Sequence, residues 1–307
     1  LDKLVKRLTQ LQRSTSPEHV TMTDFDRDSL YDRTGLERAV YFGIESLDKL
    51  VNGVLPGEFA VITSRPGVGK SMFICHLATT LSMQGKRVYV VSKEMPPEQL
   101  MHRIDATLGA FNPIIFRDQS VTKEEMSKYK SAAKDGLRAI KESGGDVIFP
   151  RAKVLTIDSI RGELDKQKPD VLLIDGIYLM QVSSGRSYGA NWERVMSVSN
   201  AIKTIALELD IPVIGTSQLK RSDNNDANLS LQDVGYSDAI GQDADVVMAA
   251  WKEKDAVDHI LGISALKCRH GSDVGTSWVQ IDWSKSMMFD MPYVAHSINF
   301  GDQNDES

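Results

Sequence analysis

Five short apolar runs, separated by longer amphipathic segments, dominate the chain from residue 43 onward. The runs are rich in Val, Ile and Leu and are too short for helices, so they predict buried β-strands. The segments between them carry apolar residues at helical spacing. Strands that alternate with helices predict a mainly parallel sheet flanked by helices, which is an α/β fold. The expected strands are 58–63, 87–92, 170–175, 211–217 and 245–251, and the expected helices are 70–84, 96–109, 122–142, 157–167 and 191–209.

Two later segments, 259–271 and 275–291, alternate between apolar and polar residues and are joined by the turn-like sequence HGSDVG. This pattern is typical of a β-hairpin. We expect the hairpin to be added at the edge of the parallel sheet.

The two ends of the chain differ from this central part. Residues 1–13 place apolar side chains on one helical face, which predicts an N-terminal helix at 1–15 that packs on its own domain or docks on a neighbouring subunit. Residues 16–41 are polar and predict an extended linker. The folded domain is then expected at 42–296, and the acidic tail 297–307 is expected to be disordered.

The composition excludes several classes of protein. Of the 307 residues, 41% are hydrophobic and 25% are charged, and no apolar run reaches the roughly 20 residues of a membrane helix, so we expect no membrane partner. The net charge of −6 argues against an extended nucleic-acid coat. Two cysteines without metal-type spacing suit a reducing cytoplasm. The chain begins with Leu1 rather than Met, and we therefore expect a fragment or a processed product.

The sequence SRPGVGKS follows the first expected strand and opens the first expected helix. Its glycines allow backbone N–H groups to surround phosphate oxygens, its lysine would reach the β- and γ-phosphates of ATP, and its serine would bind Mg²⁺. The alternative is a glycine-rich turn without a ligand. A serine stands where the common motif has its first glycine, and we expect this to be tolerated because it precedes the phosphate cradle. The candidate ATP-binding residues are Ser64, Arg65, Pro66, Gly67, Val68, Gly69, Lys70 and Ser71.

Three polar residues follow later strands. Asp175 ends a strand of four apolar residues and is a candidate Mg²⁺ ligand. Glu94 and Gln218 lie just beyond two other strands, where α/β sheets build their sites. Glu94 could orient the attacking water and Gln218 could sense the γ-phosphate, although each could equally be an ordinary capping or surface residue.

Lys267 and Arg269 are two positions apart in the first strand of the expected hairpin, so their side chains leave the same face. On an edge strand they could reach the nucleotide of a neighbouring subunit. The alternative is a charged edge that prevents aggregation.

Together these motifs resemble the ATPase domain of DnaB-type replicative DNA helicases in a phage-like form. The similarity runs in order from SRPGVGKS through SKEMPPEQLMHRIDA, VLLIDG, IGTSQLKRS and IGQDADVVM to LKCRHG, over about residues 42–290. It implies a RecA-like P-loop NTPase core, ATP and Mg²⁺ as ligands, and a homo-hexameric ring around single-stranded DNA. A primase and a helicase loader are further partners that the resemblance implies.

The resemblance also implies roles for individual residues. Glu94 matches the catalytic glutamate, Gln218 the sensor glutamine, and Lys267 and Arg269 the lysine and finger arginine that act on the neighbouring subunit. Arg103 matches an active-site arginine. The helix at 1–15 would be the linker helix that grips the adjacent subunit.

The expected DNA-binding loop departs from cellular relatives, which carry an Arg-Glu-Ser-Gly type sequence there. This chain has QDVGYSDAIGQDAD, so a tyrosine could stack on a base, or pack under the loop, and backbone N–H groups could hold a phosphate. The candidate DNA-binding residues are Lys220, Arg221, Gly235, Tyr236, Ser237 and Asp238.

Two other functions share the same core. One is a recombinase-like ATPase that forms filaments on DNA, and the other is a non-translocating, ATP-gated assembly or loader protein. The fold alone does not separate these functions, but the paired cations and the N-terminal helix favour the ring over the filament. A non-catalytic loader would not need Glu94 or Arg269, and both are present.

Overall fold

A computed structural model describes residues 36–118, 121–150, 155–185, 188–219, 229–234, 237–252, 259–270 and 275–291. The expected helix at 1–15, most of the expected linker and the acidic tail lie outside these residues. By its internal contacts the chain divides into two units, Leu1–Glu37 and Arg38–Ser307, and the fold below is that of the second.

A nine-stranded sheet forms the centre of the domain, in the order β3-β2-β4-β5-β1-β6-β7-β8-β9. The six strands from β3 to β6 are parallel, and β7, β8 and β9 continue the sheet in antiparallel fashion. The mainly parallel α/β fold expected from the sequence is therefore confirmed. The strands are β1 Phe59–Ser64, β2 Arg87–Ser92, β3 Asp146–Ile148, β4 Val171–Asp175, β5 Val213–Gln218, β6 Val246–Trp251, β7 Ile260–Cys268, β8 Thr276–Asp282 and β9 Met287–Asp290.

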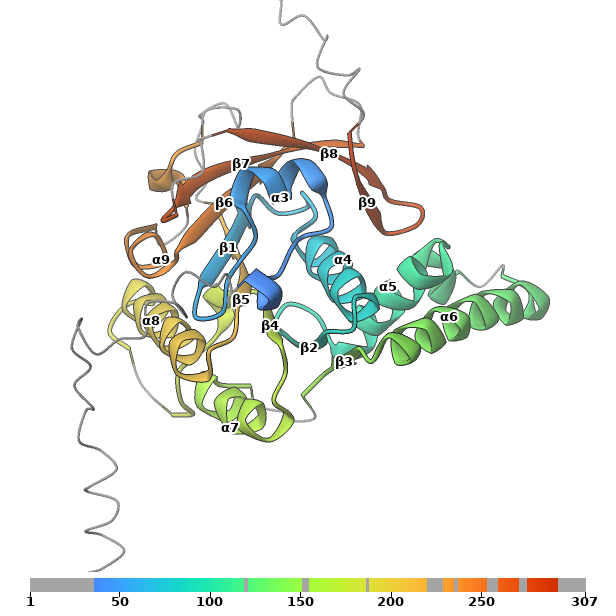
Figure 1. Ribbon diagram of the computed structural model, residues 1–307, viewed down its shortest axis with the longest axis horizontal. Helices are drawn as coiled ribbons and strands as arrows, with labels where there is room; N and C mark the ends of the chain where they lie inside the picture. Colours follow the sequence, from blue (N-terminus) through green and yellow to red (C-terminus); the bar gives the residue numbers. More distant parts are fainter. Residues whose placement is uncertain are drawn as a thin grey trace, which may run out of the picture. The chain divides into compact units, whose positions relative to one another are not determined.

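Helices cover both faces of the parallel strands, with α4 and α5 on one side and α8 on the other (Figure 1). The α-helices are α3 Glu45–Val51, α4 Lys70–Met83, α5 Pro97–Gly109, α6 Lys123–Ser143, α7 Ile157–Gln167, α8 Asn191–Leu209 and α9 Ser237–Asp243. Short 3₁₀ turns are η1 Leu36–Arg38, η2 Pro113–Phe116, η3 Ile177–Leu179 and η5 Leu231–Asp233. Within the described helices, none is long and apolar enough to cross a membrane.

The two-sided cover explains the continuous apolar runs of the sequence. All six residues of β1 are buried, and successive side chains enter opposite halves of the core. Ala60 and Ile62 pack in the half that contains α4, whereas Phe59 and Val61 pack in the half that contains α8. Because every position is buried, a polar residue in such a strand is costly unless it is hydrogen-bonded, and those at the strand ends are therefore informative.

The C-terminal strands differ from the expected hairpin. The segment 275–291 forms two strands rather than one, because the chain turns between Asp282 and Met287, where Ser286 adopts φ +53°. The Asp282 carboxylate accepts hydrogen bonds from the backbone and the hydroxyl of Ser284 and stabilises this turn. Strand β7 lies between β6 and β8, so Lys267 is on an interior strand, Arg269 directly follows it, and the condition of an edge strand is not met.

Candidate active site

The loop after β1 has the backbone of a phosphate cradle. Gly67 and Gly69 adopt φ +79° and +121°, which L side chains rarely do. A Cβ atom at Gly67 would meet nothing within 4 Å, so the loop is open on that side. The constraint on Gly67 is therefore its backbone conformation, whereas at Gly69 the ring of Trp283 adds a steric one.

Ser64 does not need to be glycine. It is the last residue of β1, fully buried, and it pairs with Gln218 of β5 and with Ala250 of β6 in extended backbone. Its hydroxyl donates a hydrogen bond of 3.0 Å to the carbonyl oxygen of Arg65. The turn that requires positive φ begins only at Gly67, which explains why a small residue is sufficient at position 64.

Helix α4 starts directly at this loop without a side-chain cap. Its N-cap is Gly69, which offers no side-chain hydrogen bond, whereas α6 begins with a complete capping box formed by Thr122 and Glu125. Uncapped N–H groups and the helix dipole together attract an anion. Five of the eight predicted ATP-binding residues line the adjoining cavity, namely Pro66, Gly67, Gly69, Lys70 and Ser71.

Lys70 has weak partners within the chain. Its Nζ lies 3.3 Å from the carbonyl oxygens of Ser64 and Arg65 and 3.4 Å from the Ser64 hydroxyl. Burial lowers the pKa of Lys70, and the carboxylates of Glu94 and Asp175 partly oppose this shift. A half-buried ammonium with only long hydrogen bonds is suited to an incoming phosphate.

Asp175 ends β4 and is fully buried. Its carboxylate accepts hydrogen bonds from Thr216 Oγ1 at 3.0 Å and Ser92 Oγ at 3.2 Å. Burial raises the pKa of Asp175, the charge of Glu94 raises it further, and hydrogen bonds from Ser71, Thr216 and Ser92 oppose the rise. A cation beside Asp175 would relieve this unfavourable burial of charge.

The residues present fit a hydrated Mg²⁺ ion. In the part of the chain that the structure describes, no group of three or more His, Cys, Asp or Glu side chains could hold a metal alone. Mg²⁺ in nucleotide sites takes one or two protein oxygens together with phosphates and water. Ser71, which lines the cavity, and the buried Asp175, to which it is hydrogen-bonded, would supply such oxygens.

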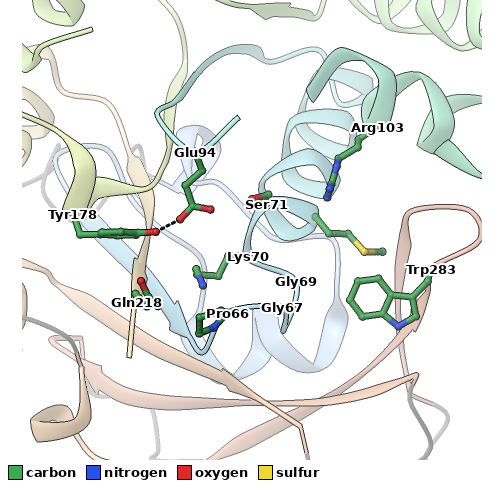
Figure 2. Close-up of a pocket in the computed structure, with 11 residues that line it drawn as sticks. Pro66, Gly67, Gly69, Lys70, Ser71, Glu94, Arg103, Tyr178, Gln218 and Trp283 are labelled. Atoms are coloured by element: carbon green, nitrogen blue, oxygen red, sulfur yellow. Dashed lines mark hydrogen bonds between the residues drawn. The ribbon is translucent and has the colours of Figure 1, made fainter. Parts of the chain in front are cut away.

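Glu94 lies in the loop between β2 and α5, with its side chain at the same cavity. Its backbone N–H donates to Ser92 Oγ at 3.2 Å. The hydroxyl of Tyr178, on the turn η3 that follows β4, donates a hydrogen bond to Glu94 Oε1 (Figure 2).

A cavity of about 360 Å³ brings these groups together. Figure 2 shows Lys70 between the Glu94–Tyr178 pair on one side and Arg103 and Trp283 on the other. Of the predicted catalytic residues, Glu94, Arg103 and Gln218 line this cavity. Three of the predicted ATP-binding residues do not: Ser64 and Val68, which are buried, and Arg65. The full lining is Pro66, Gly67, Gly69, Lys70, Ser71, Met72, Glu94, Arg103, Tyr178, Gln218 and Trp283.

Sequence reasoning missed three of the lining residues: Met72, Tyr178 and Trp283. Tyr178 had a usable signal, since it lies three positions after the strand-ending Asp175. Trp283 had none, because it comes from the distant turn between β8 and β9. There its ring lies 3.3 Å from where a Cβ on Gly69 would be.

Lys267 and Arg269 lie at the opposite end of the sheet. They meet the chain around Asp245, whose N–H donates to the carbonyl oxygen of Phe59 at the beginning of β1. The cradle follows the other end of β1, and six residues of strand separate the two ends by about 16 Å. Neither cation lines the cavity of its own chain.

Both cations are bound by the segment that ends α9. Lys267 Nζ donates to the carbonyl oxygens of Gly241 and Ala244 at 2.5 and 2.7 Å, and at 3.4 Å to that of Gln242. Arg269 donates to the Gln242 carbonyl at 2.9 Å and to Asp245 Oδ1 at 3.0 Å. Burial, and then the charge of Arg269, lower the pKa of Lys267.

Asp245 organises this second cluster. It is buried, and its carboxylate accepts hydrogen bonds from the N–H of Phe59 at 2.8 Å and from Lys203 Nζ at 2.6 Å, in addition to the bond from Arg269. Arg269 remains about half exposed, with 48% of its side-chain surface accessible. Both of its terminal guanidinium nitrogens are thus bonded within the chain, although the side chain stays half exposed.

The predicted DNA-binding residues stay untested. Lys220, Arg221, Gly235 and Tyr236 lie outside the described residues. Ser237 and Asp238 are the first two residues of α9, the helix whose other end binds Lys267.

Fold and site together have the arrangement of a RecA-like P-loop NTPase domain: a glycine-rich loop after β1, a buried aspartate at the end of β4, which β5 separates from β1, and a mainly parallel sheet flanked by helices. Residues 39–288 match the model of the DnaB-like helicase C terminal domain, and the chain belongs to that family.

Known proteins agree with this assignment. The chain is 28% identical over 261 residues to the replicative DNA helicase DnaB of Geobacillus stearothermophilus, an alignment that covers 81% of this chain and 56% of that protein. The chain thus spans about half the length of such relatives. A DnaB-like replicative helicase whose structure was solved with its primase interactions has the same fold, with a TM-score of 0.73 at 21% identity over 95% of this chain and 72% of the other. A second solved structure, of a separate ATPase domain, has a TM-score of 0.72 at 21% identity, over 95% of this chain and 98% of that domain.

Proposed function

We propose that this chain is the ATP-hydrolysing motor of a ring-forming replicative DNA helicase. The observation that carries the proposal is the convergence of five separate chain segments on one cavity. The cradle, the loop after β2, helix α5, the turn η3 and the end of β5 contribute Lys70, Glu94, Arg103, Tyr178 and Gln218. Family membership supports the same conclusion.

In the proposed reaction, a water molecule attacks the γ-phosphate of ATP in line with the leaving β-phosphate. Glu94 accepts a hydrogen bond from that water and orients it. Lys70 and the N–H groups at the start of α4 bind the phosphate oxygens, and Arg103 adds a second positive charge at the far side of the cavity. Gln218, at the end of β5, would sense whether the γ-phosphate is present.

Ser71 and Asp175 would hold Mg²⁺. When bound, this ion would neutralise negative charge that develops on the phosphate oxygens. The two side chains belong to different elements, so metal binding would also fix the distance between α4 and β4.

We further propose that the active unit is a homo-hexamer with ATP between subunits. Lys267 and Arg269 lie too far from the cradle of their own chain, and Arg269 is half exposed at the opposite end of β1. A neighbouring subunit could place its cradle against this surface. Single-stranded DNA would then pass through the centre of the ring, held by residues of the segment 220–238, and a primase and a loader would be further partners.

The first test is the variant Glu94→Gln. It keeps the size of the side chain and removes the charge, so nucleotide binding and assembly should persist while ATP turnover falls by about 100-fold or more. Hydrolysis measured by phosphate release, with nucleotide affinity measured in parallel, distinguishes the two effects. Unchanged turnover would remove Glu94 from the mechanism.

Two further measurements distinguish the helicase from the alternatives. Electron microscopy with a non-hydrolysable ATP analogue should show closed six-membered rings, whereas extended filaments would indicate a recombinase-like protein. Strand displacement on forked DNA with a 5′ or a 3′ single-stranded tail tests unwinding and its direction. ATP-dependent assembly without turnover or unwinding would support a loader.

A further inference from the structure

Tyr178 is the one aromatic hydroxyl that lines the cavity, and it contacts the carboxylate on which the proposed reaction depends. Its hydroxyl donates a hydrogen bond to Glu94 Oε1 (Figure 2). The contact joins the turn η3 after β4 to the loop after β2, segments that are 84 positions apart in the sequence.

Glu94 needs such a partner because its own segment positions only its backbone. The loop is held by the N–H of Lys93, which donates to the carbonyl oxygen of Asp175 at 3.1 Å, and by two N–H groups that donate to Ser92 Oγ. The Glu94 side chain itself is exposed at the cavity. A glutamate side chain with free rotation loses considerable entropy when it is held in one orientation, so an external contact is required to orient it in advance.

Tyr178 is itself rigidly placed. It lies in η3, one residue after Ile177, which is fully buried. Ile177 packs so closely on β5 that a Cβ added to Gly215 would lie 2.2 Å from Ile177 Cδ1. A phenol ring on this turn has only two side-chain torsions to fix, so it is a stiff support for a flexible carboxylate.

The turn η3 is also tied to the metal-binding end of the site. The N–H of Gly176 donates to Thr216 Oγ1 at 2.8 Å, and Thr216 Oγ1 donates to Asp175 Oδ1 at 3.0 Å. Gly176 adopts φ +89°, which allows the chain to turn directly from the strand into η3. Asp175 and Tyr178, which contacts Glu94, therefore lie on one rigid segment.

The phenol remains protonated under working conditions. Burial raises the pKa of Tyr178, and the hydrogen bond to Glu94 and its charge raise it further. Tyr178 can therefore act only as a donor to the carboxylate. With Oε1 occupied, Oε2 is left to accept a hydrogen bond from water.

We propose that Tyr178 is a positioning residue for Glu94: its hydroxyl fixes Oε1 so that Oε2 is directed at the water that attacks the γ-phosphate. This inference rests on the proposed ATP hydrolysis and adds a residue to it. Tyr178 acts through Glu94 and not on the nucleotide. It resembles the third group of catalytic triads, which orients the base without reacting.

The variant Tyr178→Phe removes the hydroxyl and keeps the ring. We expect kcat for ATP to fall roughly tenfold to a hundredfold, the loss typical of one hydrogen bond to a charged group, with KM changed by less than about twofold. Tyr129→Phe is the matched control. It removes the same hydroxyl from a ring that packs on Phe111 beside α6, away from the cavity, and should change neither constant.

The decisive measurement combines Tyr178→Phe with Glu94→Gln. If the tyrosine acts through the glutamate, the double variant should have the same residual kcat as Glu94→Gln alone, within about twofold. A further tenfold loss in the double variant would mean that Tyr178 acts independently and would overturn the inference. A raised KM with unchanged kcat in Tyr178→Phe would also overturn it, because the residue would then contact the nucleotide.

Failure of the broader proposal gives a different result. A wild-type chain, assembled with DNA and Mg²⁺, that does not hydrolyse ATP would remove the proposed function and this inference together. An active wild type with an equally active and folded Tyr178→Phe variant would overturn only the role of Tyr178.

Discussion

A lysine and an aspartate lie near each end of β1, but the two pairs differ in how fully their charges are hydrogen-bonded and neutralised. At the carboxyl end, Lys70 has hydrogen bonds of 3.3–3.4 Å, all to neutral oxygens. At the amino end, Lys267 has two bonds of 2.5 and 2.7 Å to carbonyl oxygens and a third at 3.4 Å. One lysine is incompletely paired beside an open cavity, and the other is saturated by the end of α9.

The acidic partners differ in the same way. Asp175 is buried among neutral hydroxyl groups, and burial raises its pKa. Asp245 is buried against two cations, Lys203 and Arg269. The carboxyl end thus retains electrostatic strain that a nucleotide and Mg²⁺ would relieve, whereas the amino end is already neutralised.

This difference separates the roles of Lys267 and Arg269. For Lys267 to reach a phosphate of another subunit, it would have to leave three carbonyl oxygens of its own chain. Arg269 also bonds Asp245 and Gln242 of its own chain, but about half of its side-chain surface stays exposed. We therefore expect Arg269 to supply the charge to a neighbour and Lys267 mainly to hold α9 in place.

The largest effect on ATP turnover is expected from two separate substitutions, one near each end of β1. Arg269→Ala should lower ATP turnover by about 1,000-fold, the lower range for a finger arginine, and Lys70→Ala should lower it at least as much. Mixing the two inactive variants should restore part of the turnover, since some interfaces would then combine an intact Lys70 with an intact Arg269. Phosphate release by the mixture, compared with each variant alone, is the measurement.

The absence of any recovery in mixtures that form rings would contradict action between subunits. Lys128→Ala, which removes a solvent-exposed cation of α6, is the control and should leave turnover unchanged. Its ion pair with Glu124 lies on the surface and contributes little.

The next effect concerns the stability of the amino end. Asp245→Asn removes the charge that two cations share, and should lower the free energy of unfolding by about 3 kcal/mol, the scale found when one partner of a buried ion pair is lost. Urea denaturation measures it. Asp210→Asn, at an exposed pair with Arg38, is the matched control and should cost less than about 1 kcal/mol. Equal losses in the two variants would show that Asp245 does not organise this cluster.

The smallest effect is expected at the carboxyl end of β1, where substitution of Asp175 should stabilise the fold rather than destabilise it. The pKa of Asp175 in the folded protein lies above its ordinary value of 3.8, so the ionised carboxylate opposes folding at neutral pH. Asp175→Asn should therefore raise the free energy of unfolding at pH 7 by about 0.5–2 kcal/mol, as found when functional strain is removed. ATP turnover should be lost at the same time.

The pH dependence of this stability difference tests whether the ionised Asp175 opposes folding. The penalty from Asp175 is complete above its folded pKa and disappears as the pH falls below its unfolded pKa, near 3.8. The gain of the Asn variant should therefore shrink as the solution is acidified through this range. A variant that is less stable than wild type at pH 7 would show that the hydrogen bonds of the carboxylate outweigh its burial.

Most secondary structure was predictable because burial on both faces leaves a local signature. The expected strand at 58–63 and the expected helix at 191–209 agree with β1 and α8 to within one residue. The three-residue β3 and the seven-residue α9 escaped prediction, since they are too short for a periodic pattern. The turn at Ser286 was missed, although the polar run 284–286 interrupts the alternation there.

The candidate site was predictable where a residue type and its place in an element are sufficient. A lysine and a serine after a glycine loop, and an acid or amide after a strand, are local features, and they singled out Lys70, Ser71, Asp175 and Gln218. The contact of Tyr178 with Glu94 is not local. It depends on β2 and β4 being neighbours in the sheet, which pairs Ser92 with Asp175.

By itself, the sequence determined the alternation of strands and helices and the phosphate loop, because both arise from residues close together along the chain. The tertiary structure alone decided the strand order, the interior position of β7, and the separation of Lys70 and Arg269 to opposite ends of β1. These features depend on contacts between residues far apart in the sequence, whose energies are set by packing in the folded core rather than by local conformational preference.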